Sequence, residues 1–115
     1  MSAAVTERQR DVLLAMQAAE VEWEGRERRG RVWRGVTAST VRDAIYPPDS
    51  PMRTKRTAGR GASSFNGSIG ALGNLAAGRI LSALEDKGLV ERFERNDSRF
   101  ILTFAGERYL KENQS

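Results

Sequence analysis

The side chains with the most chemistry to offer in this 115-residue chain are its arginines and lysines. Residues 25–60 hold ten Lys and Arg against three acids, residues 1–24 hold two against five, and residues 61–115 hold seven of each. Guanidinium and ammonium groups bind phosphate and carboxylate oxygens. The cationic middle third of a chain with a net charge of +4 therefore predicts a surface that faces a polyanion, with solvated arginine-rich loops as the alternative.

Catalytic chemistry has little support in the composition. The chain has no cysteine and no histidine, which removes disulfides, thiolates, the usual zinc ligands and the commonest general base. The acids Glu85, Asp86, Glu91 and Glu94 fall where helix and strand geometry turns several of them toward solvent, and no histidine is present to activate a serine. We expect no enzymatic activity, no cofactor and no metal site.

Residues 59–64, Gly-Arg-Gly-Ala-Ser-Ser, bear a faint likeness to a phosphate-binding glycine loop. They lack the Gly-Lys-Ser/Thr ending and do not follow a predicted strand, so nucleotide binding is not expected. The N-terminus has no long apolar core, so we expect neither a signal peptide nor a membrane span. Together with the absence of cysteine, this favours a single cytoplasmic domain.

Three amphipathic segments must supply the core that positions the charges. Apolar residues recur at spacings of three and four over about residues 6–23, with Thr6 as the N-cap. A second helix is predicted over residues 37–46, capped by Thr37 or Ser39. A third is predicted from Asn74 as N-cap to Gly88, where glycine accepts the left-handed conformation that ends a helix.

A hairpin and a closing helix are predicted after the third helix. Residues 89–94 and 99–103 favour strands, and a polar turn over residues 95–98 joins them. Thr103 is placed to cap a last helix, and Val32 with Trp33 is predicted to form a short strand beside the hairpin. Helices followed by a hairpin indicate an α+β fold.

Residues 79–92, Arg-Ile-Leu-Ser-Ala-Leu-Glu-Asp-Lys-Gly-Leu-Val-Glu-Arg, and residues 102–106, Leu-Thr-Phe-Ala-Gly, together resemble the winged helix-turn-helix family of bacterial, archaeal and phage transcriptional regulators. The resemblance is to the MarR-like and PadR-like regulators in a broad sense, specific over about residues 76–110 and looser before them. It implies one domain over residues 1–115, with a three-helix core, a two-stranded hairpin wing and a short C-terminal helix. It also implies that the third helix enters the major groove with Arg79 and Ser82 toward DNA, and that residues 95–99 form the wing.

Two features of the sequence depart from that family. A loop over about residues 47–64 is longer than the family usually places before its third helix, and the exposed face of that helix is poor in donors. We therefore expect much of the contact to be with phosphates, through a flexible basic arm formed by Arg53, Lys55, Arg56 and Arg60. Such an arm can follow the backbone or enter a minor groove.

Hydroxyl groups at the start of the second helix are further candidates, because a helix N-terminus can hold a phosphate, although ordinary capping explains them equally well. The residues expected to bind DNA are Thr37, Ser39, Thr40, Arg53, Lys55, Arg56, Arg60, Arg79, Ser82, Arg95, Asn96 and Arg99.

These expectations lead to a sequence-specific double-stranded DNA-binding protein, a small transcriptional regulator that works as a homodimer through spare apolar surface on its first and last helices. The exposed face of the third helix has few hydrogen-bonding side chains at Leu75, Ala76, Ser82 and Ala83, and this supports an alternative. This is a winged-helix protein-interaction module, such as a phage or plasmid replication or recombination accessory factor. RNA binding is disfavoured, because no paired surface aromatics form a stacking platform.

Overall fold

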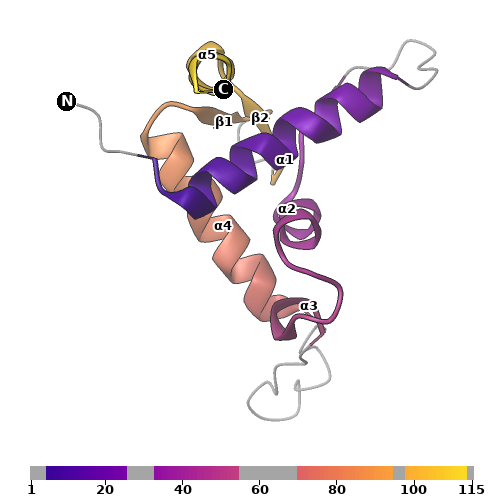
Figure 1. Ribbon diagram of the computed structural model, residues 1–115. Coiled ribbons are helices and arrows are strands. Elements are labelled where there is room, and N and C mark those ends of the chain that lie inside the picture. The colour runs from indigo at the N-terminus through magenta and orange to yellow at the C-terminus, as the bar shows by residue number, and fades with distance from the viewer. Residues whose placement is uncertain (1–4, 26–32, 55–69, 95–97, 114–115) are drawn as a thin grey trace.

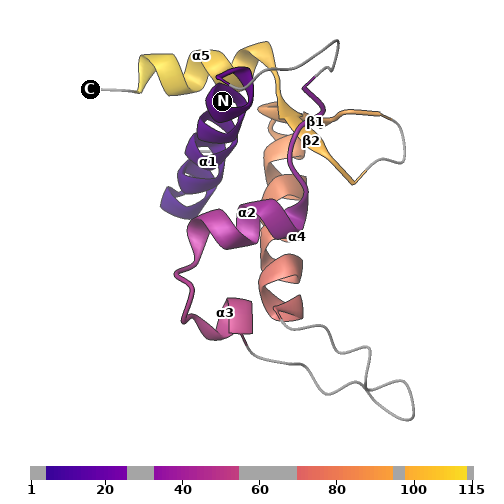
Figure 2. The ribbon, with the colours of Figure 1, turned by 90° about the vertical axis from the view of Figure 1, so that its right-hand side faces the viewer.

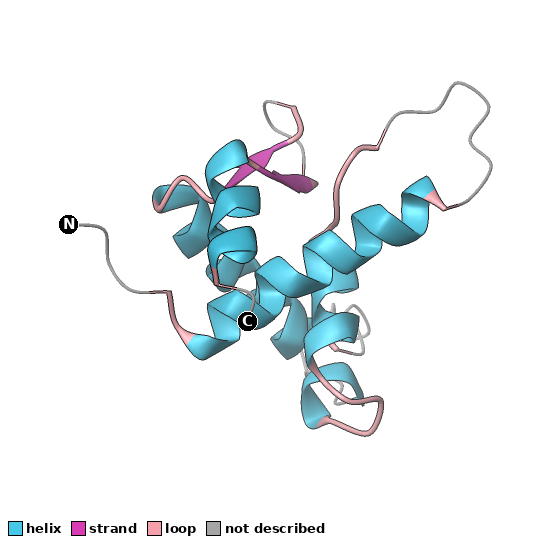
Figure 3. Ribbon diagram, turned by 45° about the horizontal axis from the view of Figure 1, so that its top comes forward, coloured by secondary structure: helices cyan, strands magenta, loops and turns pink. Residues whose placement is uncertain are grey.

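The protein is described by a computed structural model that covers residues 5–25, 33–54, 70–94 and 98–113. Helices make up most of these residues, and an antiparallel hairpin lies beside them (Figures 1 and 3). The predicted α+β class is confirmed, in an arrangement compatible with a winged-helix layout. In chain order the elements are α1 (Glu7–Glu24), α2 (Ala38–Ile45), α3 (Pro51–Thr54), α4 (Ala71–Asp86), β1 (Val90–Arg92), β2 (Phe100–Leu102) and α5 (Phe104–Glu112).

Helix α1 begins where the sequence predicts. The Thr6 hydroxyl accepts a hydrogen bond from the Gln9 amide at 3.1 Å, and the Thr6 amide donates to the Gln9 side chain at 3.0 Å. This reciprocal pair satisfies two of the amides that every helix start leaves unpaired. Behind the cap, Val12, Leu13 and Met16 are fully buried and anchor α1 in the core.

Helix α2 is capped by Thr37, whose hydroxyl accepts from the Thr40 amide at 3.3 Å. Of the two predicted caps, Thr37 is therefore correct, and Ser39 lies inside the helix. Helix α2 lies across α4, as Figure 2 shows, and buries Val41 between them. Helix α4 ends before Gly88, whose φ of 77° confirms the predicted left-handed stop.

The start of α4 differs from the prediction. The helix begins at Ala71, after Gly70 with a φ of 83°, and Asn74 lies in its first turn rather than at its cap. A Cβ atom at Gly73 would collide with the Met52 carbonyl, so the glycine lets this turn pack tightly against α3. This packing offsets the poor helix propensity of glycine. The sequence-based prediction took account of that propensity but not of the contact between Gly73 and α3.

Part of the predicted long loop is a helix. The Ser50 carbonyl accepts from the amides of Arg53 at 2.9 Å and Thr54 at 3.0 Å, and the Ser50 hydroxyl accepts from the Met52 amide at 3.2 Å. Pro51 at the first helical position suits this turn, because its φ is already helical. The sequence pattern did not predict this helical turn, which these hydrogen bonds define. Residues 55–64 of the predicted loop lie outside the described residues.

The hairpin pairs Val90 with Leu102 and Arg92 with Phe100. A bridge between Val36 and Phe100 adds a third chain segment to its edge. The predicted strand at Val32 and Trp33 is therefore displaced: Trp33 has no strand pairing, and Val32 lies outside the described residues. The hairpin is tied to the segment between α1 and α2.

One hydrophobic core joins the helices to the hairpin. Ala77, Leu81 and Leu84 of α4 are fully buried, as their spacing predicts, and they share the core with Val90 and Phe100. Residues from α1 and α5 complete the same cluster. The buried face of α4 thus shares one core with α1, α2, the hairpin and α5.

Helix α5 closes the fold against α1 and β2. The Thr103 hydroxyl accepts from the Gly106 amide at 3.0 Å and donates to the Gly88 carbonyl at 2.6 Å, which confirms Thr103 as the predicted cap. Leu110 is buried in the core. Within the described ranges, no helix combines the length and apolar character that crossing a bilayer requires.

Candidate nucleic-acid interface

A groove lies between α4 and the hairpin, which we call the α4–hairpin groove. Its volume is about 570 Å³. The outward face of α4 forms one wall, and hairpin residues with the first residue of α2 form the other. The lining residues are Ala38, Asn74, Leu75, Gly78, Arg79, Ser82, Ala83, Asp86, Arg92, Ser98 and Phe100.

Arg79 and Ser82 both line this groove and are exposed. They are three residues apart on α4 and therefore share one helix face. Leu75, 58% exposed, and Asp86 lie on the same face. The predicted outward face is therefore open to a ligand, and it presents a guanidinium, a hydroxyl, a carboxylate and an apolar side chain.

Two hairpin arginines rest against aromatic rings. The guanidinium carbon of Arg92 is 4.8 Å from the Phe100 ring centroid, and that of Arg99 is 5.8 Å from the Phe93 centroid. Arg92 Nε also lies 3.5 Å from a Glu85 carboxylate oxygen. Cations held over aromatic faces lose less entropy when they bind an anion than freely rotating ones do.

Arg92 is a groove residue that the sequence-based prediction missed. Its register opposite Phe100 puts the two side chains on the same face of the hairpin. The signal was the alternation of the two short strands, which indicates this register once the turn over residues 95–98 is assumed. Arg99, by contrast, was predicted; it is half-buried and lies at the turn end of the hairpin, where its carbonyl accepts from the Phe93 amide at 2.8 Å.

The hydroxyls of α2 serve mainly as a cap. The Thr37 hydroxyl is bonded to the Thr40 amide and lies 3.2 Å from the Thr40 hydroxyl. Ser39 and Thr40 are exposed, but neither lines the α4–hairpin groove, to which α2 contributes Ala38. The structure therefore supports the capping explanation for Thr37 and does not bring these three hydroxyls together with Arg79.

The prediction that Arg53 belongs to a flexible arm is wrong. Its guanidinium donates to the carbonyls of Tyr46 at 3.2 Å and Asp43 at 3.4 Å, and its Nε lies 3.3 Å from the Asp43 carboxylate. The unpaired carbonyls at the C-terminus of a helix attract a cation, so Arg53 fastens α3 to α2. Five other predicted contact residues lie outside the described residues: Lys55, Arg56, Arg60, Arg95 and Asn96.

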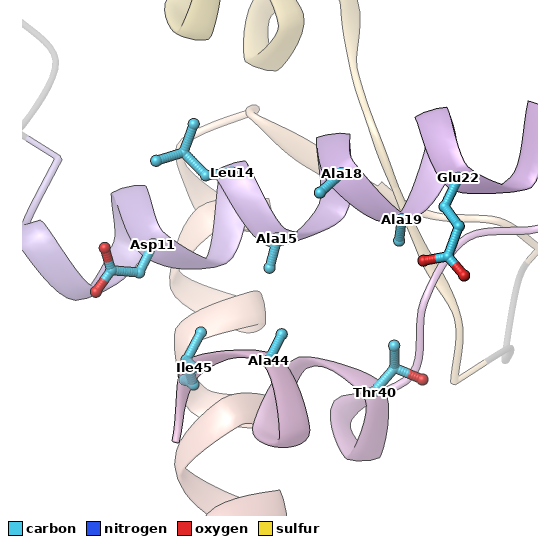
Figure 4. Close-up of a pocket in the computed structure, with 9 residues that line it drawn as sticks. All are labelled: Asp11, Leu14, Ala15, Ala18, Ala19, Glu22, Thr40, Ala44 and Ile45. Carbon is cyan, nitrogen blue, oxygen red and sulfur yellow. The ribbon is translucent and has the colours of Figure 1, made fainter. Parts of the chain in front are cut away.

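A second groove, between α1 and α2, has the opposite charge. Its volume is about 560 Å³, similar to that of the first. Figure 4 shows alanines of α1 facing Ala44 and Thr40 of α2, with Asp11 and Glu22 at opposite ends. Carboxylates repel phosphate oxygens, so the charge of its lining separates this groove from a polyanion site.

Carboxylates also approach one another between α1 and α5. Burial raises the pKa of Glu20, and the neighbouring charges of Glu107 and Glu24 raise it further. Although acids gather here, the described part of the chain has no group of three His, Cys, Asp or Glu side chains placed to hold a metal ion. These carboxylates thus lie on α1 and α5, away from Arg79 on α4 and Arg92 on the hairpin, where the acids are Glu85 and Asp86.

Comparison with known proteins adds no relative. No protein-family model matches the sequence, and neither the curated proteins nor the solved structures include a match.

Proposed function

We propose that this protein is a winged-helix protein that binds double-stranded DNA, with α4 in the major groove and the β1–β2 hairpin as the wing on a neighbouring phosphate strand. One observation carries the proposal: Arg79 and Ser82 are exposed on the α4 face that shares a groove with Arg92. The major groove of B-DNA is about 12 Å wide and admits an α-helix. A helix flanked by cationic side chains has the shape and the charge for that site.

The bonding of the hairpin to its neighbours supports its proposed role as a wing. Phe100 is buried in the core, and its backbone is bonded to Val36 on one side and paired with Arg92 on the other. Arg92 and Arg99 are therefore displayed at a set position relative to α4. In this proposal they contact phosphates and orient the protein, while Arg79 contacts a base or a phosphate.

We further propose that the protein is a cytoplasmic transcriptional regulator without catalytic activity, and that it acts as a homodimer on a two-fold DNA site. One module of this size covers only part of an operator, and a dimer doubles the contact. Apolar surface on α1 and α5 supports this assembly: Val21 is 62% exposed and Phe104 is 87% exposed. A symmetric dimer would bury such side chains on both copies.

The direct test is the affinity of fluorescent random-sequence duplexes at two salt concentrations, compared with that of sites selected from them. We expect Arg79→Ala to weaken binding to a selected site by about 5- to 150-fold, the range for one good protein–base contact. Arg34→Ala is the matched control, because it removes the same charge from an exposed position that lies neither in the groove nor on α1 or α5. Equal affinities for the wild type and Arg79→Ala would contradict the proposal.

One observation favours the second candidate, a protein-interaction module. Leu72 is 37% exposed on α4 and Leu75 is 58% exposed, and apolar side chains of this size are common at protein interfaces. If the protein is such a module, it should bind duplex DNA no more tightly than an unrelated basic protein does. Arg79→Ala should then leave the affinity for DNA unchanged. The duplex-affinity measurement described above separates the two functions.

A further inference from the structure

Three glycines of the described chain lie inside helices, at positions 73, 78 and 106. At Gly73 a Cβ atom would collide with the Met52 carbonyl, and at Gly106 with the Leu89 carbonyl, so tight packing explains both residues. At Gly78 a Cβ atom would have no described residue within 4 Å, apart from the helix's own adjoining backbone. The fold of the described residues therefore does not require a glycine at position 78.

A glycine in the middle of a helix also destabilises the helix, because glycine loses more backbone conformational entropy on folding than other residues do. Gly78 does not have a positive φ, so a left-handed backbone conformation does not explain the glycine at this position. It lies in the lining of the α4–hairpin groove, between Leu75 and Ser82 and directly before Arg79. A glycine that the fold does not require, in the wall of a groove, is expected where another molecule must come close to the backbone.

Leu75 lies one turn before Gly78 on the same wall. Its side chain has no hydrogen-bonding group, so on DNA it can recognise only an apolar feature. In the major groove that feature is the 5-methyl group of thymine. The side chain of leucine is shorter than that of arginine, so it reaches a base edge only if α4 lies deep in the major groove. The absence of a Cβ atom at position 78 lets the helix backbone come that close to the bases.

We infer that Leu75 and Gly78 form a close-contact surface that reads an A·T pair through the thymine methyl group, with Gly78 at the point where α4 approaches the bases most closely. This inference rests on the proposed function and extends it to the composition of the site. Arg79, the next residue, then contacts a neighbouring base or phosphate. The DNA site should contain a thymine at one fixed position opposite α4.

The first experiment replaces each thymine of a selected site, one at a time, with uracil, which removes only the methyl group. Wild-type protein should lose about fourfold in affinity at one position, the expected effect of one buried methyl group. Leu75→Ala should bind more weakly and no longer distinguish thymine from uracil there. Leu72→Ala is the matched control, because Leu72 is exposed on the same helix and does not line the groove; it should keep the wild-type preference.

The second experiment uses Gly78→Ala, for which stability and affinity should move in opposite directions. Thermal unfolding should occur about 4 °C higher, because alanine is the better helix former. Affinity for the selected site should fall about tenfold, because the added methyl group holds α4 away from the bases. Gly25→Ala is the control, since its Cβ atom would make only ordinary contacts of 3.6 Å at the end of α1, and it should bind DNA as the wild type does.

The outcomes separate this inference from the proposed function. If the wild type selects a site and Arg79→Ala weakens binding, the proposed function stands. If Gly78→Ala then binds as tightly as the wild type, or if no thymine position responds to uracil, the inference about Leu75 and Gly78 is wrong. If the wild type binds no duplex at all, both fail.

Discussion

Val36 and Phe100 exchange two backbone hydrogen bonds, at 2.9 Å and 2.8 Å, and so join the segment before α2 to the second strand of the hairpin. Gly35 makes this approach possible. Its φ is 90°, and a Cβ atom there would collide with the Phe100 carbonyl. The position of the hairpin beside α4 therefore depends on one glycine far from it in sequence.

Substituting Gly35 with alanine should consequently destabilise the protein by about 1–3 kcal/mol, because the residue must adopt a positive φ and displace β2. Urea unfolding monitored by tryptophan fluorescence measures this. The same glycine-to-alanine change at Gly78 should have the opposite sign. A Gly35→Ala protein as stable as the wild type would show that the bridge to Phe100 is not needed for folding.

Replacing Arg53 with alanine should affect stability more than DNA binding. The variant loses two hydrogen bonds to α2 carbonyls and an ion pair with Asp43, at a cost of about 1 kcal/mol. Because the guanidinium is engaged within the fold, affinity measured well below the unfolding temperature should change less than in Arg79→Ala. Affinity losses of equal size in the two variants would instead restore Arg53 to the DNA contact set.

Salt dependence should report the number of phosphates that the protein neutralises. If Arg92 contacts one phosphate, Arg92→Gln should reduce the slope of log affinity against log salt by about 0.9 in magnitude. Its neighbour Glu85 provides a control of opposite sign, since Glu85→Gln removes a negative charge 3.5 Å from Arg92 and should strengthen binding. An unchanged slope in Arg92→Gln would exclude Arg92 from the phosphate contacts.

The pKa of Glu20 gives a prediction about pH. Burial raises it above the ordinary value of 4.5, with Glu107 and Glu24 adding to the effect. The folded state thus favours the protonated carboxyl, and the resulting stability is fully present below the unfolded-state pKa and lost as the pH rises through the folded-state pKa. At pH 7 the ionised Glu20 opposes folding.

Glu20→Gln, which resembles the protonated form, should therefore be more stable than the wild type at pH 7, by at most about 0.5 kcal/mol because water still screens this partly buried site. The gain should shrink as the pH falls toward 4. Urea unfolding at pH 7 and pH 4 measures the difference, with Glu91→Gln on β1 as the control for the same chemical change on an exposed strand. A gain of the same size at both pH values would show that charge is not its cause.

Local physics made several features predictable. The caps at Thr6 and Thr103 and the stop at Gly88 each depend on residues within one helical turn, so the sequence is enough to place them. At the start of α2 the sequence left Thr37 and Ser39 as alternatives, and the structure has Thr37. The buried stripes of α1 and α4 follow from their apolar spacing in the same way. The outward face of α4, with Arg79 and Ser82, is the complement of its buried stripe and was predictable for that reason.

Other features depend on partners distant in sequence. Arg53 was predicted to be a flexible contact, but the carbonyls at the end of α2 bind it. Helix α4 begins before Asn74 because Gly73 packs against Met52. The local sequence pattern does not predict the partners of Arg53 and Gly73, because both interactions form only once α2, α3 and α4 have packed together.

The sequence by itself determined helices α1, α2, α4 and α5, the caps at Thr6 and Thr103, and which face of α4 stays outside the core, because those properties are set by neighbours within a few residues. Tertiary structure alone decided that Val36, rather than Trp33, meets the hairpin, that Arg92 shares a groove with Arg79, and that no described residue beyond the adjoining helix backbone would lie within 4 Å of a Cβ atom at Gly78. Each of these depends on how separate elements pack, and packing is a property of the assembled core.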